Sequence, residues 1–399
     1  MLKTLADKRV MVAGHICLDI APSFPANISG DIHTILTPGK LVNVDQAILC
    51  TGGTVSNTGL ALVKLGVDVV LNGKVGDDHL GTIVKSCLGQ KRAASFKTVA
   101  SQSTSYSVII AIPGIDRIFL HNPGTNDTFG FEDIDYAAAE KCLLFHFGYP
   151  PLMKRMFQNN GAELIEIFKR VREMGVTTSL DMTLPDPASE SGQANWAVIL
   201  KKLLPYVDIF LPSVEEIAFM LDRELFTKRK AQAGHTDPVH VYQTADYQKF
   251  ADMLLDMGVK IAAIKSGIRG YYLRTSADIS KIGKAAPQTY APWSNRELWA
   301  PSYKAAKFGS ATGAGDATIA GFICGLLSDF SPEQSLCLAN TVGWQNVRNV
   351  DALSGIEDWP ATLNYLADKT RPQNDPALDS SWTFNPQTMV YHTPRDPKP

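Results

Sequence analysis

The chain has 399 residues, of which 45% are hydrophobic and 20% charged, and its formal net charge is −2. This composition is typical of a globular protein with a large core, arranged as one large α/β domain with an appendage or as two domains. The charge gives no reason to expect nucleic acid as a partner, and no apolar run is long enough to span a membrane. The six cysteines are scattered without a Cys-x-x-Cys pair, and the N-terminus lacks a secretory apolar segment. We therefore expect reduced cysteines and a cytoplasmic protein.

Short β-rich runs alternate with helical runs along most of the chain, which predicts a largely parallel sheet covered by helices. Glycines directly follow several of the helical runs, as is typical of helix ends. A last long helix is expected to begin at Ser331-Pro332-Glu333. In chain order, the predicted strands are 9–13, 67–71, 176–180, 207–211 and 259–264, and the predicted helices are 54–65, 162–174, 214–221, 247–257 and 313–327.

One region departs from this alternation. Residues 106–112 and 117–121 are β-rich and are joined by Pro-Gly-Ile-Asp at 113–116, which predicts a β-hairpin. Together with the irregular, β-like stretch 18–50, this hairpin is expected to form a small separate sheet.

Three further stretches are harder to assign. Residues 227–247 and 289–307 have no clear secondary structure and are interpreted as insertions near a nucleotide-binding side. Residues 371–399 are rich in proline and aspartate but contain aromatic side chains, so we expect this end to dock partly onto the body.

The most informative segment is Gly313-Ala314-Gly315-Asp316, at the start of an apolar helix. A helix N-terminus offers unpaired N–H groups that attract anions, and glycines allow a phosphate to approach them. An Asp in the same turn is well placed to take a proton from an attacking hydroxyl. The segment therefore indicates phosphoryl transfer. The alternative is that Asp316 only caps the helix, since Asp is a favoured capping residue.

This Gly-Ala-Gly-Asp element resembles the C-terminal signature of the ribokinase-like (PfkB-type) carbohydrate kinases. The resemblance implies that Asp316 is the catalytic base and that the amides of Gly313, Ala314 and Gly315 form an anion hole for the phosphoryl group. It also implies ATP and Mg²⁺ as cofactors.

The same resemblance implies an α/β fold with a central, mostly parallel sheet flanked by helices on both faces, and a small β-sheet lid. The lid is expected from about residues 18–50 and 99–125, and because such lids often serve as dimer interfaces, we expect a homodimer. Residues 1–360 would form the kinase domain, and 361–399 a C-terminal extension packed on the body.

Gly52, Gly53 and Asn57 lie where a β-like segment passes into a helix. The glycines allow close approach of a ligand, and an Asn side chain can both donate and accept hydrogen bonds, as sugar hydroxyls require. Asp19 follows the first strand, where open α/β sheets bind ligands. These residues resemble the sugar-binding signature of the family, which implies that they bind the substrate, although Cys17 stands where many relatives have Asn. The alternative for Asn57 is support of the helix start.

A second set of residues resembles the residues that bind the nucleotide and the metal in this family. Glu216, in Ser-Val-Glu-Glu after a strand, resembles a family Glu that holds the water shell of Mg²⁺, an ion that needs few protein carboxylates. Lys265, Gly267 and Gly270 resemble the nucleotide-side loop, in which Lys265 or Arg269 would meet phosphates. The alternatives are a solvated glutamate and a simple β-turn.

Two positions complete this comparison. Asn340, on the last long helix, is a candidate for the adenine side. Ser310 stands six residues before the proposed base, where many relatives carry an Asp that binds a monovalent cation. Because Ser310 offers no charge, we predict that activation by K⁺ is weak or absent.

Taken together, the sequence predicts an ATP-dependent kinase that phosphorylates a primary hydroxyl of a sugar or sugar-like substrate. A nucleoside or a sugar phosphate remains an alternative acceptor, although a sugar phosphate would need clustered Lys and Arg beside Gly52–Asn57. A non-catalytic sugar or nucleotide sensor is the alternative from another class, and the intact Asp316 argues against it.

Overall fold

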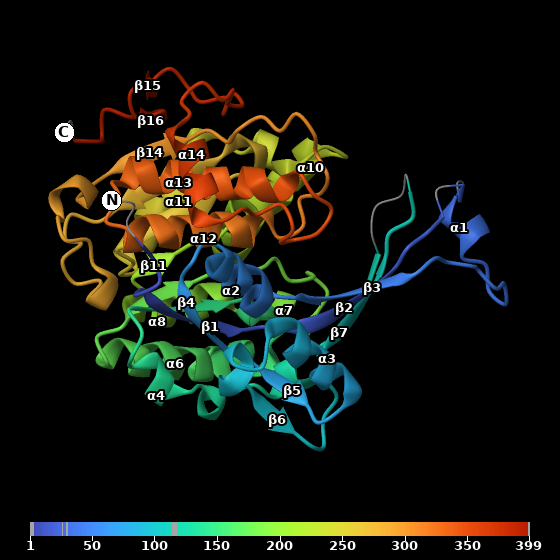
Figure 1. Cartoon of the computed structure of the whole chain (residues 1–399). Helices are drawn as coiled ribbons and strands as arrows, with labels where there is room; N and C mark the ends of the chain where they lie inside the picture. Colours follow the sequence, from blue (N-terminus) through green and yellow to red (C-terminus); the bar gives the residue numbers. More distant parts are fainter. Residues whose placement is uncertain (1–3, 26, 29–30, 114–117, 398–399) are drawn as a thin grey trace.

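The computed structural model describes residues 4–25, 27–28, 31–113 and 118–397 (Figure 1). Within these residues, a 10-stranded sheet has the strand order β15-β16-β14-β13-β12-β11-β10-β9-β1-β4. The strands from β4 to β12 run parallel, and β13, β14, β16 and β15 are added antiparallel. The predicted mostly parallel sheet is therefore confirmed. Its strands are β1 (Arg9–Gly14), β4 (Asp68–Asn72), β9 (Leu144–Gly148), β10 (Thr177–Leu180), β11 (Ile209–Phe210), β12 (Ile261–Lys265), β13 (Tyr271–Thr275), β14 (Glu297–Ala300), β15 (Thr383–Asn385) and β16 (Val390–His392).

Helices cover both faces of this sheet (Figure 1). Side chains alternate along each strand, so that in β1 Val10 and Val12 join one apolar core while Met11 and Ala13 join the other. The first core is covered by α2 (Thr54–Lys64), α3 (His79–Leu88), α12 (Ala314–Leu327), α13 (Pro332–Val347) and α14 (Trp359–Ala367). The second is covered by α4 (Tyr136–Ala139), α6 (Ala162–Glu173), α8 (Trp196–Leu203), α9 (Val214–Leu221), α10 (Arg223–Ala233) and α11 (Thr244–Asp256).

A small four-stranded sheet projects from the body as an arm, with α1 (Ile32–Ile35) toward its far end (Figure 1). The predicted hairpin is present as antiparallel β7 and β8, although residues 114–117 lie outside the described residues. Asp19 lies within β2 of this arm, which corrects its expected place at the end of the first strand: β1 ends at Gly14, and the chain enters the small sheet at Cys17. The strand order is β3 (Ala47–Gly52), β2 (Cys17–Pro22), β7 (Tyr106–Ile110) and β8 (Ile118–Asn122).

Two stretches without a sequence-based assignment contain regular structure. Residues 227–247 hold most of α10 and the start of α11, and a 2.7 Å ion pair between Arg229 and Asp246 joins the two helices. Residues 289–307 contain β14, which pairs with β13 and β16 and is buried because its side chains lie in the cores on the two faces of the sheet. Tertiary contacts, which local sequence patterns do not report, stabilise both.

The C-terminal segment extends the central sheet through β15 and β16, beside β14 (Figure 1). Arg296, next to β14, is buried and donates from Nε to Asp396 Oδ1 at 2.8 Å and from Nη2 to Glu333 Oε1 at 2.5 Å. This buried charge cluster attaches the end of the chain to the body. Within the described residues, no helix combines the length and the apolar character needed to cross a bilayer. All six cysteines are unpaired.

Candidate active site

Asp316 lies in the first turn of α12, after the N-cap residue Gly313, and is 2% exposed. Its carboxylate accepts hydrogen bonds from Thr58 Oγ1 at 2.8 Å, Asn57 Nδ2 at 3.2 Å and the Tyr149 hydroxyl at 2.7 Å. These donors belong to α2 and to the residue after β9, and none is an amide of α12. The capping alternative for Asp316 is therefore wrong, because the carboxylate faces other elements.

Tyr149 was missed by sequence reasoning. Its backbone has φ 63° and ψ 39°, a left-handed conformation that is unusual for a bulky residue and that is often found at functional sites. Burial raises the pKa of the Tyr149 hydroxyl well above its usual value, and the Asp316 carboxylate raises it further. The hydroxyl is therefore a neutral donor. The sequence offers no signal for this role beyond an aromatic residue after a buried run.

The predicted anion hole lies at the start of α12. The N–H groups of Gly313 and Gly315 have no hydrogen-bond partner in the described part of the chain, whereas that of Ala314 donates to the Ala311 carbonyl at 3.1 Å. Ala314 is thus already paired in this structure, which corrects its expected place among the free amides. Gly313 has φ 72°, and a Cβ there would lie 2.5 Å from the Ala352 side chain, so this turn requires glycine.

Lys265, at the end of β12, lies beside this turn: its Nζ is 3.8 Å from where a Cβ on Gly315 would be. The ammonium forms an ion pair with Asp181, which follows β10 and which the sequence reasoning missed. Burial alone would lower the pKa of Lys265, but Asp181 and Glu216 hold it above its usual value. Burial raises the pKa of Asp181, and the Lys265 ammonium lowers it. The Lys265 ammonium and the carboxyl groups of Asp181 and Glu216 thus lie near the glycine turn at the start of α12, where the anion hole is predicted.

Glu216 forms a capping box with Ser213 at the start of α9: Ser213 N donates to Glu216 Oε2 at 2.6 Å. Its other oxygen, Oε1, has no hydrogen bond within the described residues. In the part of the chain that the structure describes, no three His, Cys, Asp or Glu side chains gather into a metal-binding group. A hydrated Mg²⁺ that takes most ligands from water and phosphate needs only one or two carboxylates, so Glu216 and Asp181 fit such an ion.

The loop after β12 has mixed roles. Gly267 has φ 49°, and a Cβ at this position would have no neighbouring atom closer than 3.7 Å, so a ligand can approach its backbone. A Cβ on Gly270 would clash with the Ala300 carbonyl, so this glycine allows close packing against β14. Arg269 is 3% exposed and donates to the Pro376 carbonyl at 2.8 Å, so it is not available for phosphate and that part of the prediction is wrong. Asn340 is buried and donates to the Ala300 carbonyl at 2.9 Å and to the Pro301 carbonyl at 3.0 Å.

The predicted acceptor residues gather where the arm meets the body. Asp19 Oδ1 accepts a hydrogen bond from the Cys17 thiol at 3.4 Å, and Oδ2 occupies the space that a Cβ on Gly52 would need. Gly53, with φ 85°, leaves room for the carbonyl and ring of His15 in the same way. Asn57, which follows these glycines in α2, donates a hydrogen bond to the proposed base Asp316. The acceptor-side residues and Asp316 are therefore brought together, while two surface cavities of about 550 Å³, over α10 and over α13 and α14, contain none of them.

Comparisons with known proteins agree with this geometry. Residues 8–359 match the pfkB family carbohydrate kinase domain. An uncharacterized sugar kinase of Archaeoglobus fulgidus is 24% identical over 298 residues, covering 74% of this chain and 98% of the relative. The 2-dehydro-3-deoxygluconokinase of Bacillus subtilis is 22% identical over 353 residues, covering 86% and 92%.

A solved structure of Arabidopsis thaliana ribokinase, complexed with ribose and ATP, has a TM-score of 0.66 to this chain at 17% identity, and the match covers 90% of this chain and 99% of that one. The predicted ribokinase-like fold, with its large sheet and its small separate lid sheet, is thus confirmed. A family match over most of the chain, together with this fold, shows what the protein is: the chain belongs to the pfkB family of carbohydrate kinases, which transfer a phosphoryl group to an alcohol group of a sugar.

Proposed function

We propose that this sugar kinase uses ATP to phosphorylate a primary hydroxyl of a sugar or sugar-like substrate, with Asp316 as the base. The observation that carries the proposal is the position of the buried Asp316 carboxylate, between the acceptor-side helix α2 and the glycine turn of α12. A carboxylate at this junction would face both the acceptor hydroxyl and the phosphoryl group that it attacks.

Charge on the phosphoryl group would be offset at the start of α12. The free amides of Gly313 and Gly315 point from a helix N-terminus, where partial positive charge favours anions. Lys265, beside Gly315, would place its ammonium, which is paired with Asp181, next to that group. Mg²⁺, when bound, supplies further compensation of the phosphate charge, and we propose that Glu216 and Asp181 hold its water ligands.

The nucleotide would extend from this turn toward the loop after β12. Its backbone at Gly267 is open to a ligand, and Gly270 fixes the loop against β14. We propose that Asn340 acts on the same side by holding the segment at 300–301 in place. Because its cysteines are unpaired, we also propose that the protein acts in the cytoplasm.

The Asp316→Asn variant tests the base. Turnover should fall by about 10²-fold or more, while binding of ATP and of the sugar, measured by calorimetry, stays largely intact. Asp358→Asn is a matched control, because Asp358 caps α14 by accepting from Ala361 N at 2.9 Å, away from the site. It should keep normal turnover. Unchanged turnover in Asp316→Asn would refute the assignment.

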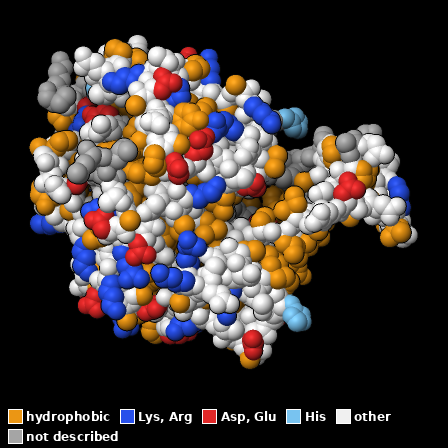
Figure 2. Space-filling view, in the orientation of Figure 1, with side chains coloured by type: hydrophobic (Ala, Val, Ile, Leu, Met, Phe, Trp, Pro, Cys, Tyr) orange, Lys and Arg blue, Asp and Glu red, His pale blue; other side chains and the backbone are white. Residues whose placement is uncertain are grey.

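We further propose that the arm mediates a homodimer. Its strands carry exposed apolar side chains, including Phe119 (56%) and Leu120 (55%), and Figure 2 shows hydrophobic side chains gathered along it. The double variant Phe119→Asp, Leu120→Asp should sediment as a monomer. Phe308→Asp, which also alters an exposed apolar side chain but on the body, should not change the mass. A wild-type protein that sediments as a monomer would refute this proposal.

A further inference from the structure

Two side chains at the acceptor end of the site have buried polar atoms without partners. His15 is 2% exposed, and neither Nδ1 nor Nε2 forms a hydrogen bond; Asn57 Oδ1 is also buried and unpaired. Buried polar groups in folded proteins are nearly always paired, and those that are not require an explanation. A bound ligand that supplies the missing partners is such an explanation. The substrate would lie close to these atoms, because Asn57 Nδ2 donates a hydrogen bond to the proposed base.

The surroundings of His15 place it at the acceptor position. Its Nδ1 lies 2.6 Å from where a Cβ on Gly53 would be. Its ring centroid is 5.5 Å from that of His121 on the arm and 6.2 Å from that of Tyr149. His15 therefore lies between the predicted sugar-binding glycine, the arm and the tyrosine that contacts Asp316.

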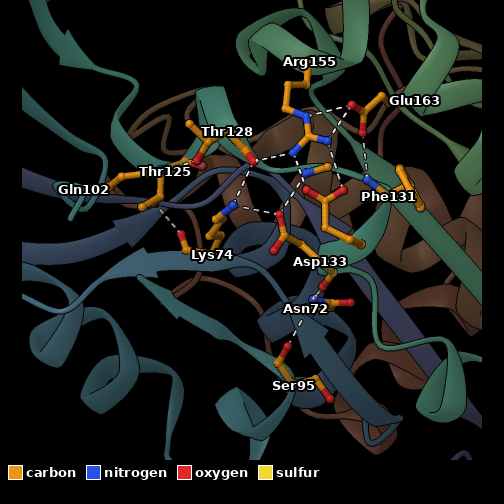
Figure 3. A network of polar contacts seen from close by, with 12 residues as sticks. Asn72, Lys74, Ser95, Gln102, Thr125, Thr128, Phe131, Asp133, Arg155 and Glu163 are labelled. Atoms are coloured by element: carbon orange, nitrogen blue, oxygen red, sulfur yellow. Dashed lines mark hydrogen bonds and ion pairs between the residues drawn. The ribbon is translucent and has the colours of Figure 1, made fainter. Parts of the chain in front are cut away.

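Basic side chains on the neighbouring elements already have partners, which are carboxylates for most of them and backbone carbonyls for Lys64 and Lys40. Figure 3 shows Lys74, in β5 (Lys74–Gly76), joined to Asp133, and Arg155 joined to Glu163. The Lys74 Nζ–Asp133 Oδ2 distance is 2.9 Å, and Arg155 also forms an ion pair with Glu132. Other described lysines around the site are likewise engaged: Lys154 with Glu190, Lys265 with Asp181, Lys64 with backbone carbonyls of Leu353 and Ile356, and Lys40 on the arm with the Thr34 carbonyl.

The free charge at the acceptor end is negative. Burial raises the pKa of Asp19, and hydrogen bonds from Cys17 and Ser107 oppose this rise, while no basic side chain acts on it within the described residues. Burial lowers the pKa of His15 to about 3 and also lowers that of His121, so both imidazoles are neutral at physiological pH. An acceptor with a carboxylate or phosphate group would meet Asp19 and Asp316 without a compensating cation.

We propose that the acceptor is an uncharged polyhydroxyl compound and that the His15 imidazole is one of the groups that bind it. This inference rests on the proposed kinase function and narrows its substrate class. A neutral imidazole offers one N–H donor and one ring-nitrogen acceptor, which matches a sugar hydroxyl. Asp19 and Asn57 Oδ1 supply acceptors for further hydroxyl protons.

The first test measures ADP release with matched sets of acceptors in which every anionic member keeps a free primary hydroxyl: glucose, gluconate and glucose 1-phosphate; ribose and ribose 1-phosphate; and fructose and fructose 6-phosphate. We expect at least one uncharged member to exceed its anionic counterparts by about tenfold or more in kcat/KM. A preference for an anionic member would overturn the inference and leave the kinase function standing. ADP release with no member above that with ATP alone would overturn the proposed function and the inference with it.

The second test addresses His15 with the sugar that reacts best. His15→Leu keeps the approximate size but removes both ring nitrogens, and it should raise KM for the sugar by about fivefold or more while KM for ATP stays unchanged. His15→Gln keeps a donor and an acceptor and should restore part of the loss. A general folding defect would change both KM values and lower the melting temperature. Equal sugar KM values in all three proteins would overturn the assignment of His15.

Discussion

Tyr149→Phe is the sharpest test of how the proposed base is held. The substitution keeps the ring and removes only the hydroxyl that donates to Asp316 Oδ2 at 2.7 Å. The structure specifies the position of this hydroxyl closely, because it holds Tyr149 at φ 63°, a conformation that costs about 1–3 kcal/mol and persists only where the surroundings enforce it. We therefore expect the hydroxyl to orient the carboxylate for proton transfer.

The magnitude follows from the contacts of Asp316. A hydrogen bond to a charged group contributes about 1.5–3 kcal/mol, and about 1.4 kcal/mol corresponds to a tenfold change in rate. Thr58 and Asn57 would still hold the carboxylate in the variant. The loss should therefore lie at the low end of this range, with kcat reduced about tenfold and KM for ATP unchanged.

The assay is steady-state ADP release at saturating sugar and ATP. Tyr136→Phe is the matched control, because the Tyr136 hydroxyl is buried without a hydrogen-bond partner and lies in α4, away from the site. It should leave kcat unchanged. If Tyr149→Phe keeps kcat within about twofold of wild type, the hydroxyl does not position the base and the reasoning is refuted.

Three further predictions concern stability and ions. Asp396→Ala should lower the free energy of unfolding by about 3–5 kcal/mol in urea titrations, because it leaves the buried Arg296 short of its partner; a loss below about 1 kcal/mol would contradict this. His146 is buried, and burial lowers its pKa from 6.5 to about 3. The unfolded chain therefore binds a proton at this histidine more tightly than the folded protein does, so the free energy of unfolding decreases as the pH falls from 6.5 toward 3. In this pH range, His146→Asn should reduce the slope of the free energy of unfolding against pH by up to about 1.4 kcal/mol per pH unit, and an unchanged slope would count against this account. Replacing Na⁺ by K⁺ should change turnover by no more than about twofold, because the Ser310 hydroxyl, 2.8 Å from Thr312 Oγ1, carries no charge to bind the ion; strong activation would contradict this.

Much of the fold could be predicted from local patterns. Alternating apolar runs indicated the parallel strands, and the spacing of apolar residues in 313–327 predicted α12 almost to the residue. Ser331 caps α13, the last long helix, as its sequence context indicates. By contrast, α10 and β14 were not assigned, since α10 is mostly polar and β14 is defined by its neighbours in the sheet.

The sequence by itself determined which segments carry candidate catalytic and binding residues: the glycine turn before Asp316, the Gly52–Asn57 run and the strand ends near Glu216 and Lys265. Only the tertiary structure decided what these groups touch. Asp316 meets Thr58, which is 258 residues away in the chain, and Lys265 meets Asp181 across 84 residues. Periodicity reports which side of a helix or strand is buried, but the partner that covers that side is fixed by the order of strands in the sheet, and this order is not a local property of the sequence.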